Sequence, residues 1–235
     1  MHKNINIKKI IHLSTLFFAF SNFSQNTQAE GLNNNFAIGA KIGIITGFGI
    51  EGRAMIAQNL YGRLGINYFG YTYKPKDNSQ INYNIKLNLL TVPLMLDYHP
   101  FDSSGFRLSL GIAYNNNNIT ANASPKNKIT LYDTDYYPNQ IGEIKSKITF
   151  GNKIIPVASI GYDSSLISND PLSFNAEFGL MYSGKARISL SANGLLGSDK
   201  KMIDDLRKDL DESLNKIEKY LKIFPIISFG IKYSF

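Results

Sequence analysis

The amino-acid sequence predicts an all-β protein: a closed, antiparallel β-barrel of eight strands that crosses a lipid bilayer. Apolar residues recur at every second position in eight segments of about ten residues, the length that a tilted strand needs to cross hydrocarbon. Tyr and Phe gather at the ends of these segments, as in the two interfacial girdles of membrane barrels. The last segment ends on an aromatic residue, Phe235.

The first 29 residues have the features of a secretory signal peptide. Three lysines precede an apolar run over residues 10–20, which is too short for a membrane anchor because spanning takes about 20 apolar residues. Thr27 and Ala29 place small side chains at the −3 and −1 positions, so we expect cleavage after Ala29. We therefore expect export through the Sec pathway and a mature barrel domain over residues 30–235.

Composition excludes several classes of function. Without the three lysines of the leader, 22 basic and 18 acidic residues remain, and the net charge falls from +7 to +4. No Lys/Arg-rich run occurs in the mature chain. This balance does not support nucleic-acid binding. The absence of cysteine excludes a disulfide framework, a thiolate zinc site and a cysteine nucleophile. We predict no cofactor and no metal.

Each predicted strand carries apolar residues on one face and Gly, polar or charged residues on the other. The apolar phase shifts by one residue at Leu89-Leu90, which predicts a β-bulge there. Residues 142–150 and 185–193 also alternate, either as extra strands or as ribbons rising above the membrane; eight strands is the prediction and ten the alternative. The eight strands are expected over residues 36–44, 48–56, 60–68, 84–98, 106–114, 154–162, 172–182 and 227–235.

An amphipathic helix is predicted over residues 199–221, before the last strand. Ser198 is placed to cap the helix, and Asp199 lies in its first turn. Pro225 is expected to stop the helix, after which the last strand begins. The helix could plug the lumen, cover the rim or dock a partner, but packing on its own barrel is favoured. Its apolar stripe consists of Ile203, Leu206, Leu210, Leu214, Ile217 and Leu221.

The alternation assigns nine charged residues, six positive and three negative, to the lumen. An eight-stranded barrel is only wide enough to be filled by side chains, so such charges must pair. We favour this packed polar core over a narrow pathway in which the positive excess selects anionic solutes. The predicted lumen charges are Lys41, Glu51, Arg53, Arg63, Lys86, Asp97, Arg107, Glu177 and Lys232.

The C-terminus carries the most specific pattern in the chain: Phe229, Ile231, Tyr233 and Phe235 stand at alternate positions. They resemble the terminal signal by which the barrel assembly machinery recognises its clients. With the leader and residues 97–114, the chain resembles the small Gram-negative outer-membrane β-barrel superfamily, which includes OmpA-type, OmpW-type and opacity-type porin-family barrels. The resemblance implies a multi-pass barrel in the bacterial outer membrane, in contact with its lipid and lipopolysaccharide. The absence of Trp and the helical insertion depart from that pattern.

The predicted function is a structural or surface-interaction role, with at most limited permeation by small solutes. Long loops would contact an extracellular or host surface ligand. The alternative is a narrow channel, as in OmpW-like proteins. A barrel enzyme that modifies lipid or cleaves peptide generally needs a His as base. The mature chain has one, His99, in a turn expected on the periplasmic side, so we predict no catalytic residue.

The leader predicts the mature N-terminus. Because cleavage should follow Ala29, N-terminal sequencing of protein purified from membranes is expected to begin at Glu30. A mature chain that still holds residues 1–20 would contradict the export prediction.

Overall fold

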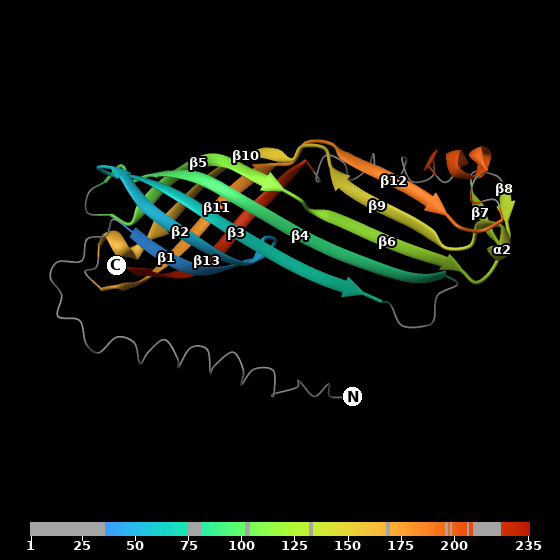
Figure 1. Cartoon of the computed structure of the whole chain (residues 1–235), viewed down its shortest axis with the longest axis horizontal. Helices are drawn as coiled ribbons and strands as arrows, with labels where there is room; N and C mark the ends of the chain where they lie inside the picture. The colour runs from blue at the N-terminus through green and yellow to red at the C-terminus, as the bar shows by residue number, and fades with distance from the viewer. Residues whose placement is uncertain are drawn as a thin grey trace, which may run out of the picture. The chain divides into compact units, whose positions relative to one another are not determined.

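The computed structural model describes residues 36–74, 81–101, 104–131, 134–167, 170–195, 197, 199–205, 207–208 and 222–235. Within this part, eight antiparallel strands close into a barrel, with β13 paired to β1 (Figure 1). The prediction of a closed eight-stranded barrel is confirmed, whereas the expected signal peptide lies outside the described residues. In spatial order, the barrel strands are β1 (Phe36–Gly43), β2 (Gly47–Ala57), β3 (Leu60–Tyr73), β4 (Ile81–Tyr98), β5 (Phe106–Asn115), β10 (Ile154–Asp163), β11 (Leu172–Tyr182) and β13 (Ile223–Ser234).

The two faces of each barrel strand have opposite character. Along β1 the side chains are alternately exposed and buried over all eight residues. The exposed positions are large and apolar: Ile42 is 52% exposed, Phe48 63% and Leu110 68%. A water-soluble protein does not leave a continuous apolar belt of this kind uncovered. The outer face is therefore the lipid-facing face of a transmembrane barrel.

Connections differ between the two ends of the barrel. At the end where β13 finishes, which we call the C-terminal end, short connections join the strands, and the 3-10 helix η1 (Ser164–Leu166) lies in one of them. The tightest is the two-residue turn after β2, where Asn59 adopts a φ of 59°, a left-handed conformation that Asn tolerates. At the opposite end the connections after β5 and β11 contain further elements.

Three strands extend the wall of the barrel at this opposite end (Figure 1). β4 is 18 residues long, and its first half pairs with β6 (Asn118–Pro125) instead of β5. β9 (Ile144–Phe150) then pairs with β6, and β12 (Ala186–Ala192) pairs with β9. We call β6, β9, β12 and the first half of β4 the ribbon. The predicted extra strands are therefore ribbon strands, and the ten-stranded barrel does not form.

The predicted bulge at Leu89-Leu90 is wrong. β4 keeps one register with β3 on both sides of that point, from Tyr73–Ile85 to Leu60–Tyr98. Side chains of β4 therefore alternate between the two faces of the wall without interruption. The apolar residues change face because the surroundings of the outer face differ between barrel and ribbon. In the barrel the apolar residues face lipid, whereas in the ribbon the apolar residues lie on the opposite face. The register shift in the barrel lies instead between β2 and β3, at residues 55–57.

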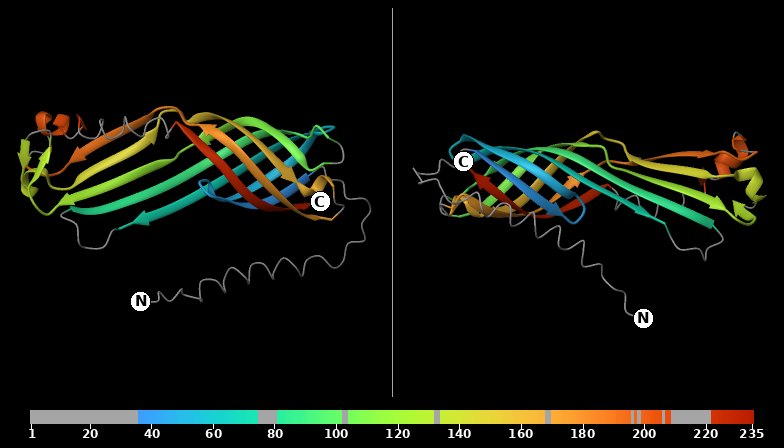
Figure 2. Two further views of the ribbon diagram at one scale, coloured as in Figure 1. Left: turned by 180° about the vertical axis from the view of Figure 1, so that it is seen from behind. Right: turned by 60° about the horizontal axis from the view of Figure 1, so that its bottom comes forward.

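The far tip of the ribbon carries its own small core. β7 (Ile129–Leu131) pairs with β8 (Thr134–Tyr136), and α2 (Pro138–Ile141) follows. Residues 200–205 and 207–208 are helical, and Met202 packs with Tyr136 and Ile141. Asp199 is the cap of this helix, because its Oδ1 accepts a 2.9 Å hydrogen bond from the Met202 N–H. Most of the predicted stripe lies outside the described residues, but the start of the helix packs on the ribbon (Figure 2).

The boundary between belt and ribbon can be tested with two arginine substitutions. Leu110→Arg places a charge in the middle of β5 on the lipid-facing side and should destabilise the inserted barrel by about 2–4 kcal/mol. Ser189→Arg lies on an exposed face of the ribbon and should change stability by less than about 0.5 kcal/mol. Urea unfolding in phospholipid vesicles measures both. Equal tolerance at the two positions would contradict the assigned belt.

Candidate functional site

Nine charged side chains of the described residues meet inside the barrel, and all nine are buried. Every barrel strand contributes one of them and β2 contributes two, because alternation turns every second residue inward. Five are cations and four are carboxylates. We call this set the lumen cluster: Lys41, Glu51, Arg53, Arg63, Asp97, Arg107, Asp163, Glu177 and Lys232.

Arg63 lies at the centre of the lumen cluster and binds carboxylates from three different strands. Its Nε donates to Asp97 Oδ2 over 2.7 Å. Its Nη1 and Nη2 donate to Glu51 Oε2 over 3.1 Å and to Glu177 Oε1 over 2.9 Å. The rigid, planar guanidinium is suited to this role because it presents five donors in fixed directions. Arg63 thereby links β3 to β2, β4 and β11.

Asp163 holds a second group of ion pairs toward the C-terminal end. Its Oδ2 lies 2.7 Å from Arg53 Nη1 and 2.7 Å from Lys232 Nζ. Its Oδ1 accepts a 2.7 Å hydrogen bond from the Ser165 hydroxyl. The Arg53 guanidinium also stacks over the Tyr61 ring, 4.5 Å from its centroid. One carboxylate therefore joins strands β2, β10 and β13.

Longer ion pairs connect these two groups. Arg107 lies 3.7 Å from Asp97, 3.8 Å from Asp163 and 3.6 Å from Glu177. Lys232 also lies 3.4 Å from Glu51, which in turn has Lys41 of the neighbouring strand β1 at 2.8 Å. Each charge thus has an opposite partner within 4 Å, the condition under which buried charges are tolerated.

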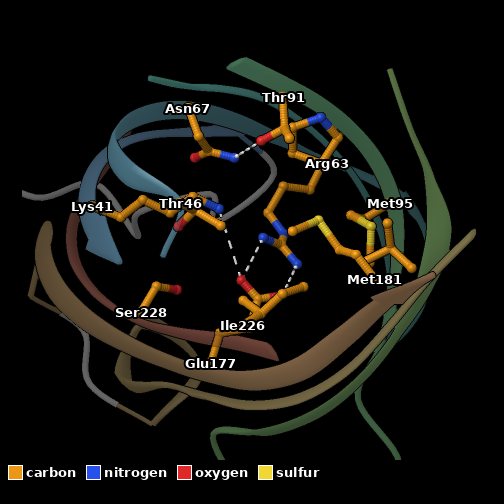
Figure 3. Close-up of a pocket in the computed structure, with 12 residues that line it drawn as sticks. Lys41, Thr46, Arg63, Asn67, Thr91, Met95, Glu177, Met181, Ile226 and Ser228 are labelled. Atoms are coloured by element: carbon orange, nitrogen blue, oxygen red, sulfur yellow. Dashed lines mark hydrogen bonds and ion pairs between the residues drawn. The ribbon is translucent and has the colours of Figure 1, made fainter. Parts of the chain in front are cut away.

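The rest of the lumen, toward the ribbon, contains both apolar and neutral polar side chains. Met95, Val157, Met181 and Ile226 belong to a cluster of buried hydrophobic residues on that side. Between this cluster and Arg63 lies a cavity of about 20 Å³ (Figure 3), room for about one water molecule. The lumen is therefore filled by a layer of ion pairs and a second layer, which is aliphatic on one side and carries neutral polar side chains such as Asn67 and Thr91 on the other.

The structure brings together eight of the nine predicted lumen charges. Lys86 is the exception: it is exposed on the ribbon, opposite Thr120 of β6. Because β4 has no bulge, an even-numbered residue cannot share a face with Asp97. Asp163 was missed because it was assigned to a loop. The alternation of β10, which turns Ser159 inward, reaches Asp163 if the predicted strand over residues 154–162 is extended by one residue.

His99 lies directly after β4 and is buried. Its Nδ1 lies 3.2 Å from the Phe106 carbonyl oxygen, and its ring packs edge-on against Tyr61 at 5.3 Å between centroids. Burial lowers the pKa of His99 to about 4. The imidazole is therefore neutral at pH 7, held in a packed setting. Asp102 and Ser103, in the same turn, lie outside the described residues.

The four residues of the predicted assembly signal lie on β13 and at its end. Phe229, Ile231 and Phe235 are exposed on the outer face, and Tyr233 is half-buried against the Phe235 ring. β13 pairs with β11 on one side and β1 on the other. The alternating aromatic pattern is thus the lipid-facing edge of the strand that closes the barrel.

The closed eight-strand barrel, with its apolar belt and its charged lumen, has the architecture of outer-membrane β-barrels. Among solved structures, CarO2 of Acinetobacter baumannii is similar, with a TM-score of 0.56 and 20% identity over 85% of this chain and 98% of that chain. CarO of the same organism gives 0.53 and 18% over 85% and 97%. At these identities the likeness shows a shared fold. A major outer membrane protein from Thermus thermophilus gives only 0.46 and 13% over 85% and 98%, too little to support an argument.

Sequence comparisons add no family. No protein-family model matches the chain, and no curated protein matches it. In the described part of the chain, no helix combines the length and apolar character needed to cross a membrane. The same part contains no group of three or more His, Cys, Asp or Glu side chains arranged to hold a metal ion.

Removal of the central cation should destabilise the barrel strongly. Arg63→Met leaves Asp97 and Glu177 without their shortest ion pair and takes one of two close cations from Glu51. We expect a loss of about 3–5 kcal/mol in the free energy of unfolding. The matched control is Lys128→Met, which breaks the exposed 2.6 Å pair with Asp135 and should leave the free energy of unfolding close to that of the wild type. Denaturant unfolding in detergent micelles measures both, and similar losses would contradict the central role of Arg63.

Proposed function

We propose that this protein is an outer-membrane β-barrel whose lumen is closed and whose role is structural or carried by its surface. The observation that supports this most directly is the lumen cluster. Its ion pairs cross the interior between strands, and the cavity above Arg63 has a volume of only about 20 Å³. Permeation would then be limited to very small solutes at most.

The membrane location is supported by the belt of exposed apolar side chains, since only lipid makes such a surface stable. In this placement the C-terminal end faces the periplasm and the ribbon faces outward, because short turns are periplasmic in such barrels. Export through the Sec pathway and recognition of Phe235 by the barrel assembly machinery belong to the same proposal.

The ribbon is the part suited to a surface role. It continues β4 beyond the barrel and ends in the small core around Tyr136 and Ile141. A paired sheet holds its outer residues in fixed positions, which long flexible loops do not. We propose that an extracellular or host surface ligand would bind on this part.

A narrow channel is the second candidate, supported by the polar side of the cavity. Lys41, Thr46, Asn67 and Thr91 line it between Arg63 and the ribbon (Figure 3). A continuous path would have to pass Arg63, whose three carboxylate partners come from both sides of the lumen. The closed lumen is therefore the better proposal.

We assign no catalytic role to His99. A general base should have a pKa near the working pH, so that it binds the abstracted proton well, and should face a substrate. The pKa of His99, lowered to about 4, and its burial against Tyr61 both oppose this.

Planar-bilayer conductance separates the closed lumen from the channel. Refolded wild-type protein should give no regular conductance steps. The double variant Arg63→Ser with Glu177→Ser removes one charge of each sign and shortens two side chains that cross the lumen, so it should give small, measurable currents. The control, Lys128→Ser with Asp135→Ser, removes an exposed pair and should behave as wild type. Discrete, ion-selective steps in the wild type would overturn the closed lumen.

A further inference from the structure

The outer face of the barrel wall changes character abruptly where the ribbon begins. β6 continues β5, β9 leads into β10, and β12 continues β11. The junctions are tied by backbone hydrogen bonds, including Gly151 N–H to the Lys185 carbonyl oxygen over 2.9 Å. The side of the wall that faces lipid in the barrel therefore continues as the outer side of the ribbon.

This stretch of wall is cationic and lacks acidic residues. Residues 144–153 and 183–192 contain five cations and no Asp or Glu. On the ribbon itself, Lys147 stands opposite Thr120 and Arg187 opposite Thr149, so both lie on the outer side. The five cations, all exposed, are Lys145, Lys147, Lys153, Lys185 and Arg187.

An apolar groove lies directly below these cations on the lipid-facing side. The small side chains of Pro156 and Ala158 on β10 form its floor, and Leu110 of β5 and Leu180 of β11 stand on either side. The groove has a volume of about 360 Å³ and is lined almost entirely by apolar atoms. Its width and lining suit a hydrocarbon chain.

The cations and the groove belong to the same strands. Lys153 precedes Ile154, the first residue of β10, and its Nζ lies 2.8 Å from Asn116 Oδ1 and 5.9 Å from the Tyr114 ring centroid. Lys185 follows Tyr182, the last residue of β11, by three positions. Both lysines therefore lie next to the ends of the strands that form the groove, close in sequence to Tyr182 and, for Lys153, near the Tyr114 ring.

We propose that this wall binds an anionic lipid of the outer leaflet, with an acyl chain in the groove and a phosphate that carries the net negative charge against Lys153, Lys185 and Arg187. Charge complementarity identifies this occupant, since each cation near a membrane surface attracts anionic lipid by about 1 kcal/mol. The opposite wall offers no such match, because the turn between β1 and β2, residues 44–46, is uncharged. The inference rests on the proposed membrane location.

The absence of tryptophan from the chain allows a clean fluorescence test. Leu180→Trp places a reporter beside the groove, and Ile50→Trp places one on the opposite lipid-facing wall, where Ile50 is 62% exposed. Each variant is refolded into vesicles that contain brominated phosphatidic acid or brominated phosphatidylcholine with the same acyl chains. Bromine quenches only a Trp that it contacts, so the two lipids can be compared at each site.

At Leu180→Trp we expect phosphatidic acid to bind about fivefold more tightly than phosphatidylcholine, the effect of one well-placed cation. At Ile50→Trp the two lipids should be equivalent. Adding Lys153→Gln, Lys185→Gln and Arg187→Gln should abolish the preference at Leu180→Trp. Adding Lys200→Gln, Lys201→Gln and Arg207→Gln, at exposed helical positions near the tip, should leave it unchanged.

Two results would overturn the site. One is the same lipid preference at both Trp positions, and the other is a preference that survives loss of the three rim cations. Failure of the proposed membrane location would look different: neither Trp would be quenched by either brominated lipid. Heat-modified migration on gels establishes that each variant is folded before the comparison.

Discussion

Neutralisation of charge inside the barrel is the interaction on which the other features depend. Lipid outside and a narrow interior leave no bulk water near the lumen cluster, so each charge needs an opposite partner within reach. Because every strand supplies a member, the pairs can form only when all eight strands stand in the correct order and register. Arg63 and Asp163 each bring together residues from several strands. The lumen cluster thus specifies the circular order of the strands. The apolar belt does not specify this order, because every strand contributes the same kind of residue to it.

The ribbon shows what happens to the same strand pattern once lipid is absent from one side. Within the barrel, β4 turns Leu94 and Leu96 outward, but above it the outward positions are Asn84, Lys86 and Asn88. Ile85, Leu87 and Leu89 then lie on the inner side, in line with Met95. The two halves of β4 therefore meet different surroundings through a change in sequence, while the register of the strand with β3 stays the same. The wall keeps its geometry while its outer chemistry passes from aliphatic to cationic.

The alternation of apolar residues was sufficient to predict the barrel, its eight strands and eight of nine lumen charges. Alternation failed where the surroundings of a strand are unknown, because the sequence does not show whether its apolar face meets lipid or the inner side of the wall. Lys86 was assigned inward because its neighbours Ile85 and Leu87 were taken to face lipid, and a bulge was then needed to reconcile them with Leu90. Asp163 was lost because strand ends and loops share the same residue types. The extra strands at residues 142–150 and 185–193 were visible, but no local pattern distinguishes a strand in the barrel wall from one that extends it.

The distribution of lumen charges among hairpins bears on how barrels of this kind change their strand number during evolution. The β4–β5 hairpin contributes Asp97 and Arg107, which balance each other, whereas β10 and β11 contribute two carboxylates, Asp163 and Glu177. The strands at the closure, β1 and β13, contribute two lysines. Duplication or loss of the β4–β5 hairpin would leave the net charge of the lumen unchanged, but gain or loss of the β10–β11 hairpin would require compensating substitutions elsewhere. Evolution by gain or loss of a whole hairpin is therefore easier at β4–β5 than at β10–β11.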